Sequence, residues 1–208
     1  MTTDDSASEV RKTVRRIKAN SRFDLHKESF LPYWNKAESL RSGAVVIWHA
    51  YNGTDTSISP QSLGFGEGFS FHVSLPPIFY FLTGLSIEVL LKAICRAHNK
   101  PPNDIHRLVD LSESAGIPLG DNDKIILRAL TEYVYWAGRY PTPKNQKEWD
   151  CAHSIFDRQH KCSGKLSEYA IKERSIDLEN YDRIWGILSE CFWGKYENTV
   201  ESISLGFD

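Results

Sequence analysis

The chain has 208 residues, and its 25 Lys and Arg against 27 Asp and Glu give a formal net charge of -2. This balance excludes a globally basic nucleic-acid coat but not a local basic face. With 41% apolar and 12% aromatic residues, the composition is that of a folded protein, and the length suits one core. We expect a polar arm with a basic helix over residues 1–27 and a single domain over residues 28–208.

The N-terminal segment Met1–Glu9 is polar and acidic and lacks the pattern of a secretory signal. The longest stretch without Asp, Glu, Lys or Arg, residues 68–87, is broken by Pro76 and Pro77. It leaves about ten apolar helical residues, fewer than the roughly 20 that a membrane span needs. We therefore expect a cytoplasmic protein without membrane contact, whose cysteines are reduced thiols or metal ligands.

The first predicted element is a basic amphipathic helix over residues 10–18. Val10, Val14 and Ile17 recur there at helical spacing, and basic residues occupy the other faces. Such a helix could contact nucleic acid or an acidic partner. Alternatively, it docks on its apolar stripe and leaves its charges in water.

Five further helices are predicted by apolar residues that recur three or four apart. The most apolar of them should be central in a bundle, because it is apolar on most faces and begins after two prolines. The predicted ranges are 33–51, 78–98, 104–115, 121–137 and 177–196. No segment alternates convincingly as a strand, so we predict an all-α bundle of five to six helices with long loops.

Two long connections separate these helices. The first, residues 52–74, is rich in Gly and Ser, and we expect Phe65, Phe69 and Phe71 to pin part of it to the core. Loops of this length are uncommon unless they are functional or mobile, so it is a candidate lid or interface.

The second connection, residues 141–166, contains the symmetrical spacing Cys151, His153, His160 and Cys162. Two extended arms joined by a turn could direct all four side chains at one tetrahedral zinc ion. The alternative is four unrelated residues in a flexible loop.

No established catalytic motif is present. The glycine-rich stretch over residues 64–68 follows no predicted strand and lacks the Lys-Ser/Thr ending of a phosphate loop. The chain also lacks a His-Glu-x-x-His pair and a Gly-x-Ser-x-Gly elbow. Hydrolase, kinase and dehydrogenase functions therefore have no support, and no cofactor is implied.

Three segments occur in an order that resembles the HEPN group of helical proteins. They are residues 85–93 (LSIEVLLKA), His106-Arg107-Leu108 followed by Leu111, and residues 135–141 (YWAGRYP). The resemblance implies an up-and-down bundle, frequently a homodimer, in toxin–antitoxin or antiviral defence systems of bacteria. It also implies RNA or a nucleotide as ligand, and an antitoxin or other protein as partner.

Active members of that group are metal-independent ribonucleases that use an Arg followed, after four to six residues, by a His. No Arg and His of this chain have that spacing: Arg22 and His26 have three residues between them, and Arg41 and His49 have seven. We therefore expect a non-catalytic binding protein, or a rearranged ribonuclease site that pairs His106 with Arg139.

Several polar residues at the matched positions could converge on one site. Glu88 and Lys92 stand four residues apart on one helix face, and Arg139 next to Tyr140 suits phosphate recognition with base stacking. The expected catalytic residues are Arg139 and His106, and the expected ligand-binding residues are Glu88, Lys92, Arg96, Arg107 and Tyr140.

Two other interpretations stay open. The polar residues could be structural, with an intrahelical Glu88–Lys92 pair and with Arg139 capping its helix end or neutralising Glu88. The protein could also be a dimerising interaction module whose six Trp serve a core and a helix-face interface.

Overall fold

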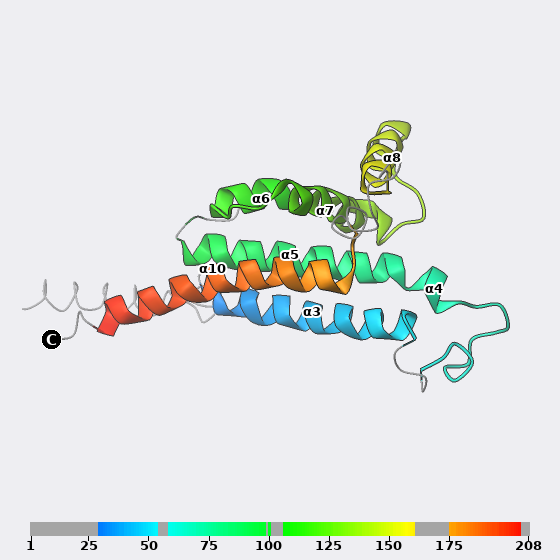
Figure 1. Cartoon of the computed structure of the whole chain (residues 1–208), viewed down its shortest axis with the longest axis horizontal. Helices are drawn as coiled ribbons and strands as arrows, with labels where there is room; N and C mark the ends of the chain where they lie inside the picture. The colour runs from blue at the N-terminus through cyan, green and yellow to red at the C-terminus, as the bar shows by residue number, and fades with distance from the viewer. Residues whose placement is uncertain (1–28, 54–57, 99, 101–105, 161–174, 205–208) are drawn as a thin grey trace, which may run out of the picture.

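The computed structural model describes residues 29–53, 58–98, 100, 106–160 and 175–204. For residues 156–160 and 195–204 it describes the backbone alone. Every regular element in these ranges is a helix, which confirms the predicted all-α bundle (Figure 1). The basic helix predicted over residues 10–18 lies outside them. The elements are α3 (Leu31–Tyr51), α4 (Phe71–Ser74), α5 (Pro76–Ala97), α6 (Leu108–Ala115), α7 (Asp121–Glu132), the π-helical turn η1 (Tyr133–Ala137), α8 (Gln146–His160) and α10 (Leu178–Ser204).

Helix α5 is the centre of the bundle, and it packs against α3, α6, α7, η1 and α10. Successive layers run in opposite directions: α3 runs one way, α5 returns, α6 and α7 run forward again, and α10 returns (Figure 1). Helix α8 is steeply inclined to the long helices and packs against α7 near its end (Figure 1). The apolar sequence of α5 explains its position, because a helix that is apolar on most faces must be covered on most faces.

Buried apolar side chains of α3, α5, α6, α7 and α10 form one hydrophobic cluster. By length and composition, the segment Phe71–Ala97 is apolar enough to cross a membrane, but 61% of its most apolar 18-residue stretch is buried inside the bundle. The core helix of a globular protein passes the same test, so this segment is weak evidence for a membrane span.

Two glycines allow η1 to approach α5 closely. A Cβ atom on Gly138 would lie 2.4 Å from Phe81 Cβ, and one on Gly84 would lie 2.7 Å from Val134 Cγ2. Since a side chain at either position would force the helices apart, these glycines fix the distance between η1 and the central helix.

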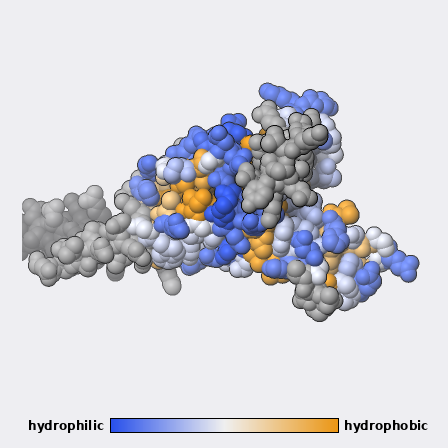
Figure 2. All heavy atoms as spheres, in the orientation of Figure 1, coloured by the Kyte–Doolittle hydropathy of each residue, from blue (hydrophilic) through white to orange (hydrophobic). Residues whose placement is uncertain are grey.

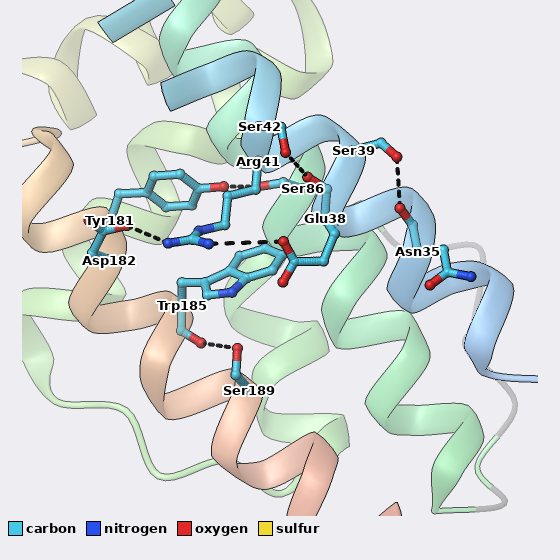
Figure 3. A network of polar contacts seen from close by, with 10 residues as sticks. All are labelled: Asn35, Glu38, Ser39, Arg41, Ser42, Ser86, Tyr181, Asp182, Trp185 and Ser189. Carbon is cyan, nitrogen blue, oxygen red and sulfur yellow. Dashed lines mark hydrogen bonds and ion pairs between the residues drawn. The ribbon is translucent and has the colours of Figure 1, made fainter. Parts of the chain in front are cut away.

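Polar contacts join α3, α5 and α10 (Figure 3). Arg41 Nη2 donates to Asp182 Oδ1 at 3.1 Å, and the guanidinium lies 5.3 Å from the centre of the Trp185 ring. The buried hydroxyls of Ser86 and Tyr181 are 2.6 Å apart, and burial raises the pKa of Tyr181 above its ordinary value. Each of these contacts bridges two helices, so we interpret the network as architecture.

Three sequence predictions need correction. The predicted helix over residues 104–115 begins at Leu108, and α8 lies inside the predicted 141–166 loop. Of the three phenylalanines expected to pin the first loop, only Phe71 is buried. Phe65 and Phe69 are exposed and stack on each other, with ring centroids 4.3 Å apart.

Candidate functional site

A buried carboxylate in α5 holds two potentially cationic side chains. The Glu88 side chain is 5% exposed, and its Oε1 lies 2.7 Å from Lys92 Nζ and 2.9 Å from His106 Nδ1. Lys92 stands one helical turn after Glu88, which is the favourable order for such a pair. The other oxygen of Glu88, Oε2, is buried without a hydrogen-bond partner among the described residues.

His106 reaches Glu88 from the segment before α6. The N–H of Leu108 donates to the buried Thr131 Oγ1 at 3.2 Å, which fixes this segment against α7. The backbone at Arg107 is extended, with φ -77° and ψ 111°, so the His106 and Arg107 side chains leave the chain on different sides. His106 therefore contacts Glu88, whereas Arg107 lines a neighbouring pocket.

This arrangement orients the His106 ring. When Nδ1 carries the proton, it donates to Glu88 and leaves Nε2 as an acceptor. The side chain is 50% exposed, and its ring lies edge-on to Tyr135 with centroids 5.9 Å apart. Tyr135 thus connects the buried charge cluster to the pocket.

The pocket has a volume of about 740 Å³ and lies between η1, the segment that follows it, and the first turns of α8. Three aromatic side chains line it: Tyr135, Trp136 and Tyr140. Three cationic side chains join them: Arg107, Arg139 and Lys144. The pocket therefore combines flat apolar surfaces with positive charge.

The π-helical turn places these aromatic side chains. The Gly138 N–H donates to the Tyr133 carbonyl at 3.0 Å, a bond that spans five residues where an α-helix spans four. The wider turn changes the direction of the side chains relative to α7. Such turns are frequent at functional sites.

Arg139 lies just after η1 and is exposed. Its Nη2 donates to the carbonyl oxygen of Tyr135, so Arg139 caps the helix end as one interpretation of the sequence expected. Its guanidinium also lies 5.6 Å from the centre of the Tyr140 ring. It does not neutralise Glu88, whose ion-pair partners within the described ranges are Lys92 and His106.

Two carboxylates also line the pocket. Glu148 accepts hydrogen bonds from the Lys144 N–H and from Asn145 Nδ2, both at 3.1 Å, so it is engaged at the start of α8. Glu132 Oε2 accepts a hydrogen bond from Trp136 Nε1 at 3.2 Å. Burial raises the pKa of Glu132, the Glu148 charge adds to the rise, and the Trp136 bond and Arg107 oppose it.

The predicted site residues fall into three places. Glu88, Lys92 and His106 meet in the buried cluster, and Arg107, Arg139 and Tyr140 line the pocket next to it. Arg96 lies elsewhere: its guanidinium is 4.6 Å from the centre of the Tyr33 ring on α3. Arg96 is eight positions after Glu88, which is about 12 Å along a helix.

The zinc hypothesis required two extended arms, and its first arm is helical. Cys151 and His153 both lie in α8, and residues two apart on a helix point in different directions. The centre of the His153 ring instead lies 4.3 Å from the centre of the Trp149 ring. His160 is the last residue of α8, Cys162 lies outside the described residues, and no group of three metal-binding side chains occurs among the residues described.

Sequence reasoning did not select Glu132, Trp136 or Lys144. Trp136 and Tyr135 belong to the sequence segment 135–141 considered above, but nothing in their spacing indicated a π-helical turn. Comparison of the chain with family models, with curated proteins and with solved structures finds no match in any of the three.

Proposed function

We propose that this chain is a HEPN-like protein of a bacterial defence or stress system that binds RNA or a nucleotide in the pocket between η1 and α8. One observation carries the proposal: three cationic side chains and three aromatic rings line the same concave surface. Guanidinium groups bind phosphate oxygens in a bidentate way, and aromatic rings stack on bases.

The size and charge of the pocket agree with this ligand. Its volume of about 740 Å³ falls in the range of about 300 to 1,000 Å³ that small-molecule sites occupy. Both Glu148 oxygens accept hydrogen bonds at the start of α8, and one Glu132 oxygen accepts the Trp136 N–H. The three cationic side chains also outnumber the two carboxylates in the lining.

The test is equilibrium binding of a fluorescein-labelled single-stranded RNA, followed by anisotropy. We expect Arg139→Ala to weaken binding by roughly ten- to hundredfold, since a charge-assisted contact contributes roughly 1.5 to 3 kcal/mol. Arg128→Ala is the matched control, because Arg128 is exposed on α7, does not line the pocket and carries the same charge. Absence of RNA and nucleotide binding, or equal losses in both variants, would contradict the proposal.

The hydrogen bond between Glu88 and His106 favours a rearranged ribonuclease site as an extension of this function. His106 Nε2 would take the proton of the 2′-hydroxyl, and the 2′-oxygen would attack phosphorus to form the 2′,3′-cyclic phosphate. The bond between phosphorus and the 5′-oxygen would break, the 5′-oxygen would take a proton from water, and His106 would release its proton to solvent. Arg139 would bind the phosphate oxygens. RNA that stays intact with concentrated wild-type protein in EDTA would dismiss this extension and leave the binding proposal standing.

The second candidate function is a dimerising interaction module. It is favoured by exposed apolar side chains before and within α4, where Figure 2 shows apolar surface; Val73 is 77% exposed and Leu63 is 60% exposed. Light scattering tests it: a dimer in the wild type that dissociates in Val73→Asp supports this function. A wild-type monomer at high concentration would remove it.

A further inference from the structure

The pocket contains a carboxylate, Glu132, that one hydrogen bond holds in place and that can accept further hydrogen bonds. Trp136 Nε1 donates to Glu132 Oε2 at 3.2 Å, and this hydrogen bond restricts rotation of the Glu132 side chain. No described residue donates a hydrogen bond to Oε1 of this carboxylate. Since a carboxylate offers about four acceptor positions, Glu132 can still accept two donors from a ligand.

The surroundings of Glu132 make such a ligand favourable. Burial raises the pKa of the carboxyl group, because loss of water disfavours its charged form. Arg107 lies near enough to influence Glu132, but its ion pair is with Asp110 at 3.8 Å. Hydrogen bonds from a ligand to the charged carboxylate would offset the cost of its burial.

The aromatic rings around Glu132 indicate a flat ligand. Trp136 carries the indole that holds Glu132, and the exposed rings of Tyr135 and Tyr140 line the same pocket. A planar group that stacks on one of these rings could reach the carboxylate with its edge. Arg139 lines the same pocket, with its guanidinium 5.6 Å from the centre of the Tyr140 ring, and can bind a phosphate there.

Among the RNA bases, guanine alone offers two adjacent donors on its Watson–Crick edge, N1–H and the N2 amino group. Adenine and cytosine place an acceptor nitrogen beside their amino group, and uracil places acceptors on both sides of N3–H. A carboxylate would be repelled by these acceptors and left with one bond at most.

We propose that the pocket selects guanine, through a bidentate contact from N1–H and the N2 amino group to the Glu132 carboxylate. This inference rests on the proposed binding of RNA or a nucleotide and adds the identity of the base. Glu132 is then the specificity-determining residue, Trp136 is the residue that positions it, and Arg139 binds phosphate whatever the base.

The test compares probes that differ in one base. The probes are fluorescein-labelled uridine octamers with a central guanosine, inosine, adenosine, cytidine or uridine, together with GMP and IMP as free nucleotides. Inosine lacks only the N2 amino group, so the guanosine and inosine pair isolates the second hydrogen bond. We expect the wild type to bind guanosine probes at least about tenfold more tightly than the other probes, as for bidentate base contacts in general.

The matched variants are Glu132→Gln and Glu190→Gln. We expect Glu132→Gln to lose the preference and to keep the affinity for the uridine octamer, whereas Glu190→Gln, on the exposed face of α10, should keep both. Equal binding of guanosine and inosine probes by the wild type would overturn the guanine proposal and leave RNA binding intact. A preference that persists in Glu132→Gln would do the same, and binding of no probe would overturn both proposals.

Discussion

His106 Nδ1 lies 2.9 Å from the same Glu88 oxygen that Lys92 Nζ approaches at 2.7 Å. One buried carboxylate therefore holds the central helix and the segment before α6 together. The same contact directs His106 toward Tyr135 and the pocket. The structural and functional interpretations of this cluster are compatible, because the residue that stabilises the bundle also orients the exposed imidazole.

We expect Glu88→Gln to lower the free energy of unfolding by about 2 kcal/mol or more, because it leaves the ammonium group of Lys92 facing a neutral amide in the bundle. Urea denaturation measures this change. Glu190→Gln removes the same charge from an exposed position of α10 and should change stability by less than about 0.5 kcal/mol. Equal stability of the two variants would show that the Glu88 cluster contributes little to the fold.

We expect Gly138→Ala to destabilise the protein by about 1 to 3 kcal/mol, since the new methyl group would meet Phe81 and force η1 from α5. Gly186→Ala is the control: it lies inside α10, where a Cβ atom meets nothing within 4 Å. That substitution should stabilise the helix by up to about 1 kcal/mol. Thermal or urea unfolding compares them, and a loss that is the same in both would refute the close approach.

The pKa of Glu132 predicts a pH dependence. Burial raises this pKa in the folded protein above the ordinary value of 4.5, so the folded state keeps the proton after the unfolded chain has lost it. The stability from the protonated group is complete below pH 4.5 and is lost as the pH rises through the folded pKa. Glu132→Gln has no such loss.

We therefore expect Glu132→Gln to gain stability relative to the wild type as the pH rises from 4.5 toward neutrality, with a plateau above the folded pKa. Urea unfolding of both proteins across this range measures the difference. A difference that stays constant with pH, or that changes in the opposite direction, would contradict the burial of this carboxyl group.

Cysteine alkylation reports on occupation of the pocket. Cys151 is exposed and lines the pocket, whereas Cys95 is buried and burial raises its pKa. We expect iodoacetamide to react faster with Cys151 than with Cys95. Saturating RNA should slow the reaction at Cys151 and leave Cys191, a partly exposed thiol on α10, unchanged. Unchanged alkylation of Cys151 with RNA bound would place the ligand elsewhere.

Apolar periodicity predicted α3, α5, α7 and α10, because each of these helices buries a face in the core. It did not predict α8, whose buried contact is made by Ala152 among polar residues. A local signal was present: the Asn145 side chain accepts the Glu148 N–H at 3.0 Å, and Glu148 reaches back to Asn145 Nδ2. Asn followed three residues later by Glu is typical of a helix start.

The sequence predicted part of the site for a similar reason. Glu88 and Lys92 are neighbours on one helix, so their contact follows from spacing alone. The approach of Arg107 and Arg139 to one pocket depends on the extended backbone before α6 and on the π-helical turn. Neither feature has a periodic signature, and the role of Glu132 depends on both.

The most direct test of the account is the salt dependence of RNA binding by the wild type, Arg139→Ala and Arg128→Ala. For single strands the logarithm of the affinity falls by about 0.7 per phosphate contact for each tenfold rise in salt. The account predicts weaker binding and a shallower slope by about 0.7 for Arg139→Ala, with Arg128→Ala matching the wild type. Identical slopes for wild type and Arg139→Ala would show that Arg139 binds no phosphate and that the pocket is not the RNA site.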